Sequence, residues 1–260
     1  MTVSIEDPQV NAFIFHPRRE MSGPSDAAVA TVTEVEGAVI GGYLHPNKNS
    51  DTLVLFFHGN GEIAADYGAL AHLYTGCGAS FWVVDYRGYG RSTGAPSYTR
   101  MRSDAEAVLA DLPALEAASE IRFGRIVVMG RSLGSASAIH LAAVLRDRVH
   151  GLVLDSPFAD GPALIRRLGG PEVDPALTPG FEDNIDQMKT CSLPVLIIHG
   201  TEDWIIPISD AEALYDACPS AEKRLVKIRG AGHNDLLVQG YGTYFSAIRS
   251  FLESIRPANR

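Results

Sequence analysis

The chain has 260 residues, of which 46% are hydrophobic and 20% charged, and its formal net charge is −9. This composition excludes a disordered chain, and the acidic balance argues against a nucleic-acid partner. The apolar runs at residues 53–57 and 195–198 are far too short to cross a membrane, so no integral membrane segment is expected. The length suits one α/β domain, and we predict a single domain over residues 1–260.

The N-terminus has neither the basic start nor the apolar stretch of a secretory signal. Three cysteines (Cys77, Cys191 and Cys218) lie far apart, which is typical of reduced, buried thiols, and we expect a cytoplasmic protein. Neither the cysteines nor the eight histidines have the spacing of a metal site, so no metal and no other cofactor is expected.

In chain order, the first 28 residues are mixed, and residues 11–15 could form a short strand or a hydrophobic plug. Residues 30–36 alternate as a half-buried antiparallel strand does, and residues 38–44 form its hairpin partner. Short apolar runs then predict buried strands at 52–57, 80–84, 125–129 and 151–154, and further strands are expected at 194–198 and 224–228. Helical patterns occupy 63–74, 100–120, 135–145, 209–217 and 241–255, and Pro113 should kink or split the second of them.

Strands that alternate with helices predict the α/β class, with a mostly parallel sheet of about eight strands flanked by helices. Residues 156–192 break this rhythm, because they carry five prolines and only one segment with helical character, at 162–168. We interpret this stretch as a short lid inserted over the active site.

The segment Gly130-Arg131-Ser132-Leu133-Gly134 lies between a predicted buried strand and an Ala-rich helix. A Gly-x-Ser-x-Gly at such a junction forms a sharp turn that exposes the serine as a nucleophile. Gly130 and Gly134 are expected because a Cβ at either position would strike the crossing strand and helix.

A serine nucleophile requires a histidine that accepts its proton and a carboxylate that orients the histidine. Downstream of Ser132, Asp203 and His233 each follow the end of a separate predicted strand, in the order Ser, Asp, His. Glu202 is the alternative acid. The other seven histidines lie in helices, at strand starts or before the required acid, so we predict the triad Ser132, Asp203 and His233.

An oxyanion formed on the substrate needs two backbone N–H donors. Leu133, directly after the nucleophile, should supply one of them from the positive end of its helix. The loop His58-Gly59-Asn60-Gly61 should supply the other, from Asn60 or, as the alternative, Gly61. We expect His58 to shape this loop rather than to act in catalysis.

From residue 31 to the C-terminus, these motifs resemble the α/β-hydrolase superfamily. The loop at 58–61 and the stretch at 85–92 (Asp-Tyr-Arg-Gly-Tyr-Gly-Arg-Ser) are similar to the Bem46 and ABHD13/ABHD17-like serine hydrolases, relatives of the serine aminopeptidase-type lipases. The resemblance implies the α/β-hydrolase fold, the same triad, and an Arg87 that ties down the loop at 85–92. The chain lacks the N-terminal Cys cluster of the membrane-bound relatives, which argues against a protein-depalmitoylase role.

The sequence therefore predicts a serine hydrolase that cleaves small-molecule carboxylic esters or thioesters through an acyl-enzyme. One alternative is a peptidase with the same triad, in which Glu62, Glu172 or Asp174 would hold a free N-terminus. The other is a receptor that binds a ligand without catalysis. Phe158, Phe181 and Trp204 could line the pocket, although ordinary packing is the preferred role for them. The oligomeric state is open.

Overall fold

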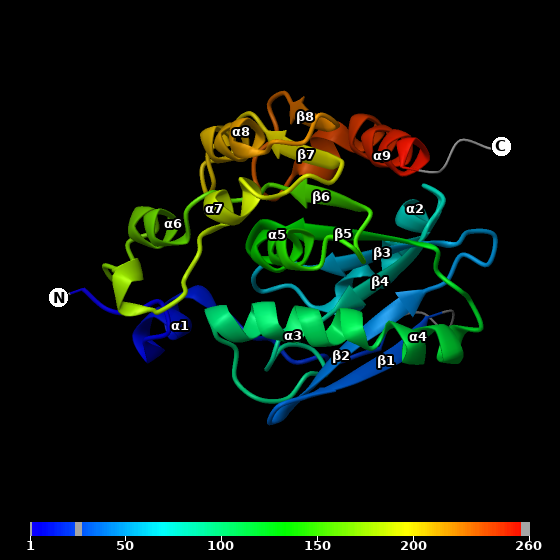
Figure 1. Cartoon of the computed structure of the whole chain (residues 1–260), viewed down its shortest axis with the longest axis horizontal. Coiled ribbons are helices and arrows are strands. Elements are labelled where there is room, and N and C mark those ends of the chain that lie inside the picture. The colour runs from blue at the N-terminus through cyan, green and yellow to red at the C-terminus, as the bar shows by residue number, and fades with distance from the viewer. Residues whose placement is uncertain (1, 24–27, 256–260) are drawn as a thin grey trace.

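Eight strands form one sheet within residues 2–23 and 28–255, the part of the chain that the computed structural model describes. Their order is β1-β2-β4-β3-β5-β6-β7-β8 (Figure 1). The pairs β1–β2 and β2–β4 are antiparallel, and the remaining pairs are parallel. The strands are β1 (Val29–Val35), β2 (Ala38–His45), β3 (Thr52–Phe57), β4 (Ser80–Val84), β5 (Arg125–Arg131), β6 (Gly151–Asp155), β7 (Val195–Gly200) and β8 (Lys223–Ile228).

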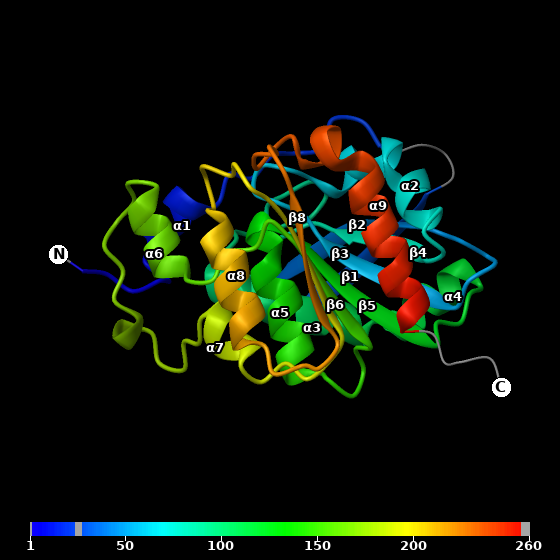
Figure 2. The same ribbon diagram turned by 90° about the horizontal axis from the view of Figure 1, so that it is seen from above.

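Helices cover both faces of this sheet, which explains why β3, β4, β6 and β7 are buried at every position. The chain crosses from β3 to β4 in one direction and from β4 to β5 in the other, so right-handed crossovers place their helices on opposite faces. Helices α2 (Ala71–Thr75) and α9 (Leu236–Ser254) lie on one face; α3 (Tyr98–Ala110), α5 (Ser135–Val144) and α8 (Ile208–Ala217) lie on the other (Figure 2).

The long helical pattern at 100–120 is split as expected. Helix α3 ends at Ala110, and α4 (Leu112–Ser119) begins anew with Pro113 in its first turn, where a missing N–H costs little. The pattern at 63–74 also divides, into the 3-10 helix η1 (Ala64–Ala69) and α2. The α/β class and the parallel sheet predicted from the sequence are confirmed.

Residues 11–15 are not a strand, and that prediction was wrong. Residues 11–14 belong to helix α1 (Pro8–Ile14), and Phe15 directly follows it. The helix begins after Asp7 because the Asp7 carboxylate accepts the Gln9 N–H at 2.8 Å and Pro8 occupies the first helical position. Val10 is fully buried, so the helix is held by packing as well as by its cap.

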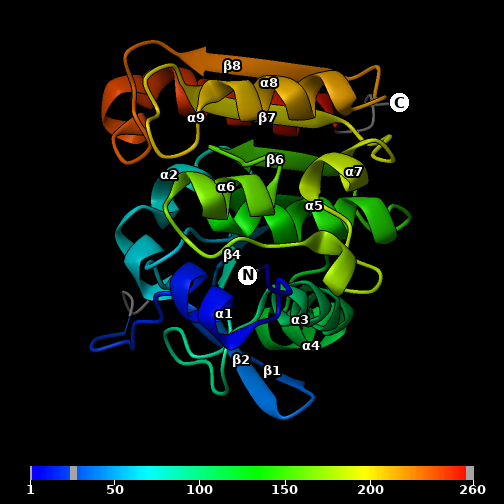
Figure 3. The same ribbon diagram turned by 90° about the vertical axis from the view of Figure 1, so that its left-hand side faces the viewer.

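The segment at 156–192 contains helix α6 (Gly161–Arg167), the 3-10 helix η3 (Pro175–Leu177) and helix α7 (Asn184–Met188). Helices α1 and α6 lie side by side at one end of the molecule (Figures 1 and 3). Val3 and Val173 form an isolated parallel bridge, so the N-terminal segment is joined directly to this insertion.

Candidate active site

The carboxyl ends of β5, β7 and β8 meet at one edge of the sheet and bring three predicted residues together. Ser132 Oγ lies 2.9 Å from His233 Nε2, and His233 Nδ1 lies 2.7 Å from Asp203 Oδ2. All three residues are at most 9% exposed. Ser132 lies at the carboxyl end of β5, beside β3. The direction of the crossovers reverses between these two strands, and open α/β sheets bind ligands at such a point.

Ser132 occupies the left-handed region with φ 50°, an unfavourable conformation for a residue with a Cβ. It directly follows β5 and starts the 3-10 helix η2 (Ser132–Gly134), which leads into α5. A Cβ on Gly130 would overlap the Gly134 carbonyl, and a Cβ on Gly134 would overlap the Phe57 carbonyl. The two glycines therefore permit the close crossing that exposes the serine hydroxyl.

Asp203 is fixed by four groups. Its Oδ1 accepts the backbone N–H groups of Ile205 (2.9 Å) and Ile206 (2.8 Å), while His233 and His199 contact Oδ2. Burial alone would raise the pKa of Asp203, but the hydrogen bonds from the two histidines and from the Ile206 amide bring this pKa well below its usual range. The alternative acid Glu202 is exposed to solvent.

Arg131 connects the serine turn to the two other loops of the site, a role that the sequence did not reveal. Its guanidinium pairs with Glu62 and donates to the His233 carbonyl at 2.9 Å. Glu62 in turn accepts the Gly59 N–H and the Tyr67 hydroxyl, each at 2.7 Å. Only the opposite charges of the two side chains hinted at a pair, because 68 residues separate them in the sequence (positions 62 and 131).

The loop after β3 is held from its other side by the Asn60 side chain. Asn60 Oδ1 accepts the His16 backbone N–H (3.0 Å) and the Tyr89 hydroxyl (2.7 Å), and Asn60 Nδ2 contacts His16 Nδ1 at 2.8 Å. These contacts join the loop after β3 to the N-terminal segment and to the stretch at 85–92.

Two further predictions about this region agree with the contacts. His58 is fully buried, with Nδ1 2.8 Å from the Gly59 carbonyl oxygen, so it shapes the loop from within the protein. Arg87 forms two hydrogen bonds to the Asp104 carboxylate, at 2.7 and 2.9 Å, and donates to the Glu36 carbonyl, which ties down the stretch at 85–92.

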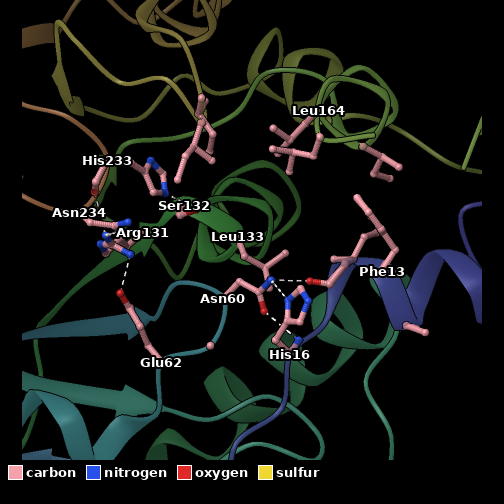
Figure 4. A pocket seen from close by; sticks show the side chains of 17 residues that line it. Phe13, His16, Asn60, Glu62, Arg131, Ser132, Leu133, Leu164, His233 and Asn234 are labelled. Carbon is pink, nitrogen blue, oxygen red and sulfur yellow. Dashed lines mark hydrogen bonds and ion pairs between the residues drawn. The ribbon is translucent and has the colours of Figure 1, made fainter. Parts of the chain in front are cut away.

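A cavity of about 590 Å³ opens beside Ser132 (Figure 4). Leu133, Asn60 and Gly61 lie on its wall next to the triad. The rest of the wall is largely apolar and comes from α1, α6 and the turn after β7. These apolar residues are Ala12, Phe13, Ile14, Leu164, Ile165, Leu168, Ile205 and Ile206.

The three aromatic residues considered as pocket lining are absent from this wall. Phe158 is 2% exposed in the core, Phe181 packs on Tyr98 with ring centres 5.7 Å apart, and Trp204 is 90% exposed. Phe158 and Phe181 therefore have the ordinary packing role that was preferred for them. Proximity of Trp204 to Asp203 in the sequence was misleading because the chain turns the indole outward.

Across residues 2–23 and 28–255, no cluster of three His, Cys, Asp or Glu side chains is placed to hold a metal ion. In the same part of the chain, no helix combines the length and the apolar character needed to cross a bilayer. Cys77, Cys191 and Cys218 are all buried and free.

The strand order and the serine turn at the end of β5 define the class of α/β-hydrolase enzymes. The chain belongs to the α/β-hydrolase family described as serine aminopeptidase, S33, whose model matches residues 48–173 and 175–237. It is 33% identical over 214 residues to alpha/beta hydrolase domain-containing protein 17B of Homo sapiens, covering 81% of this chain and 69% of that protein. Alpha/beta hydrolase domain-containing protein aho-3 of Caenorhabditis elegans is 31% identical over 214 residues, and the match covers 81% of this chain but only 60% of that protein.

Solved structures share the fold at lower identity. An esterase from Pyrococcus furiosus superposes with a TM-score of 0.75 at 18% identity, covering 93% of this chain and 98% of the other. A soluble variant of monoglyceride lipase from Saccharomyces cerevisiae, in complex with a substrate analog, gives 0.67 at 19% identity, with 93% and 100% covered. These likenesses establish the fold, and the chemistry has to be argued from the site.

Proposed function

We propose that this hydrolase cleaves carboxylic esters or thioesters of small molecules through an acyl-enzyme formed on Ser132. The observation that carries the proposal is the unbroken line of contacts Ser132 Oγ–His233 Nε2 (2.9 Å) and His233 Nδ1–Asp203 Oδ2 (2.7 Å). Asp203 holds the His233 proton at Nδ1, which leaves Nε2 free to accept the serine proton.

In the first step, Ser132 Oγ bonds to the substrate carbonyl carbon while its proton passes to His233 Nε2. The negative charge that develops on the carbonyl oxygen is stabilised by the backbone N–H groups of Leu133 and Asn60. His233 then gives the proton to the leaving alcohol or thiol, and the carbonyl bond to the leaving group breaks. Water releases the acyl group by the same steps, with His233 again as the base.

The apolar wall of the cavity favours an acyl group over a peptide with a free N-terminus. A peptidase would need an unpaired carboxylate in the pocket, and the Glu62 carboxylate is already engaged by Arg131, Gly59 and Tyr67. Glu172 pairs with Arg166, and Asp174 caps the start of η3. None of the three carboxylates is therefore available to an incoming ammonium group without breaking an existing contact.

The test is hydrolysis of p-nitrophenyl esters from acetyl to palmitoyl, and of the matching acyl thioesters, by the purified protein and its Ser132→Ala variant. We expect hydrolysis with a maximum at one chain length that is lost in the variant. Labelling of Ser132 by a fluorophosphonate separates an active hydrolase from a receptor. Absence of both hydrolysis and labelling would contradict the proposed function.

A further inference from the structure

The N-terminal segment supplies part of the cavity wall, although residues 1–47 lie outside the part of the chain that the family model matches. Ala12, Phe13, Ile14 and His16 all border the cavity. In Figure 4, Phe13 from α1 and Leu164 from α6 project toward the same space, at the end of the cavity away from Ser132. Helix α6 belongs to the matched residues and α1 does not, so a segment outside the matched family domain completes the far end of the cavity.

The segment is anchored on both sides of α1. Before the helix, the Val3 N–H donates to the Glu172 carbonyl (2.9 Å), the Asp174 N–H donates to the Val3 carbonyl (3.0 Å), and the Ile5 side chain is fully buried. After the helix, Phe15 is 4% exposed and the His16 N–H donates to the Tyr89 hydroxyl at 2.8 Å. These contacts hold α1 in a fixed position against the body of the enzyme.

Phe13 has little freedom to move within this arrangement. A Cβ built on Gly170 would lie 2.5 Å from Phe13 Cε1 and 2.7 Å from Phe13 Cδ1, so the ring rests directly on the Gly170 backbone. The same Cβ would lie 2.7 Å from Ile165 Cγ2, so the side chains of Phe13 and Ile165 both pack against Gly170. The ring therefore cannot move toward Gly170 without displacing the backbone of the insertion.

We propose that Phe13 determines acyl-chain selectivity, by closing the end of the cavity that a linear acyl chain on Ser132 would reach. The inference rests on the proposed acyl-transfer function and assigns the limit on chain length to a residue outside the matched family domain. Each methylene that enters the apolar cavity strengthens binding by about fourfold, and this gain stops where the chain meets the ring. Leu164 and Ile165 of α6 line the same cavity.

The experiment measures binding rather than turnover, in the Ser132→Ala protein, by calorimetric titration with straight-chain fatty acids from butanoate to palmitate. We expect affinity to rise with chain length up to a limit. Adding Phe13→Ala should move the limit to longer chains, and adding Phe13→Trp should move it to shorter ones. Gly170→Ala, whose added Cβ should push the ring into the cavity, should also move the limit to shorter chains. Gln9→Ala, at an exposed position of the same helix, is the matched control.

The inference is overturned if the chain-length profile is the same in the parent and in folded Phe13 and Gly170 variants, or if none of the fatty acids binds. A shifted profile in a protein without Ser132-dependent hydrolysis would support the role of Phe13 and contradict the proposed function. Far-ultraviolet circular dichroism and thermal melting establish which variants are folded.

Discussion

The ends of the neighbouring strands β5 and β6 carry two serines in nearly the same backbone conformation but in different chemical settings. The strands pair in register with Arg131 opposite Asp155, so Ser132 and Ser156 occupy equivalent positions one residue further on. Both have φ 50°. Ser132 Oγ faces His233 and the cavity, whereas Ser156 is fully buried and its Oγ contacts Asp155 Oδ1 at 2.8 Å.

The comparison separates backbone strain from reactivity. Both strand ends carry a left-handed serine, but of these two serines Ser132 alone has an imidazole within reach and borders the cavity. The Ser156 hydroxyl is held by a carboxylate that also accepts the Tyr244 hydroxyl at 2.8 Å. The strained turn presents a side chain, and the residues around it decide whether that side chain can act.

The largest expected effect comes from removing each hydroxyl in turn. Ser132→Ala should lower kcat by roughly 10⁴-fold or more, since the nucleophile is lost. Ser156→Ala should leave kcat within about threefold and lower the free energy of unfolding by about 1–2 kcal/mol, because Asp155 loses a donor. Steady-state kinetics and urea unfolding of both variants measure these effects. A large loss of kcat in a folded Ser156→Ala protein would contradict the conclusion that Ser156 takes no part in catalysis.

The charged residues before the two serines provide the next test. Arg131→Met should lower kcat by roughly 10–100-fold with a smaller change in KM, since it frees the His233 loop and leaves the half-buried Glu62 unpaired. Asp155→Asn, the control at the register partner, keeps an acceptor for Tyr244 and should change kcat by less than about threefold. Fluorophosphonate labelling rates of Ser132 should follow kcat. Equal losses in the two variants would show that Arg131 has no specific role in positioning.

Sequence reasoning reached residues whose role follows from strand ends and missed residues whose role depends on tertiary contacts. Ser132, Asp203 and His233 each follow a strand of the parallel part of the sheet, so they share its carboxyl edge, and the structure places them in contact. Phe13 borders the cavity only because α1 packs beside α6, which no local pattern encodes. The sequence of the first 28 residues is mixed, and no helix was predicted where Asp7 and Pro8 start one.

The chain leaves the two strands differently. Strand β5 runs straight into η2 and α5, whereas β6 leads into the insertion at 156–192, which contains Asp183. Asp183 accepts the Gly161 N–H at the start of α6 and is 6% exposed. Burial raises the pKa of Asp183 to about 6 in the folded protein. The folded state therefore binds this proton more tightly than the unfolded chain, whose Asp pKa is about 3.9, and stability falls as pH rises from about 4 to about 6.

The expected loss across that pH range is roughly 2–3 kcal/mol of unfolding free energy, and it should be absent in Asp183→Asn. Urea unfolding at several pH values measures it, with the exposed Asp147→Asn as the control that keeps the wild-type slope. An Asp183→Asn protein with an unchanged pH dependence would show that other groups set the slope.

The smallest effect concerns the third non-glycine residue with positive φ among those described, Glu120, which ends α4 with φ 58°. It is exposed and precedes the amino end of β5, whereas Ser132 follows the carboxyl end, so its strain serves no chemistry that the site requires. Glu120→Gly should raise the free energy of unfolding by about 0.5–1 kcal/mol, because glycine accepts this conformation without steric cost. Glu120→Ala keeps the strained Cβ and should give no such gain, and both variants should keep wild-type kcat. If alanine stabilises the protein and glycine does not, the unfavourable free energy at this position comes from the Glu120 side chain rather than from the backbone conformation. A positive φ at Ser132 and Ser156 would then not be evidence of backbone strain either.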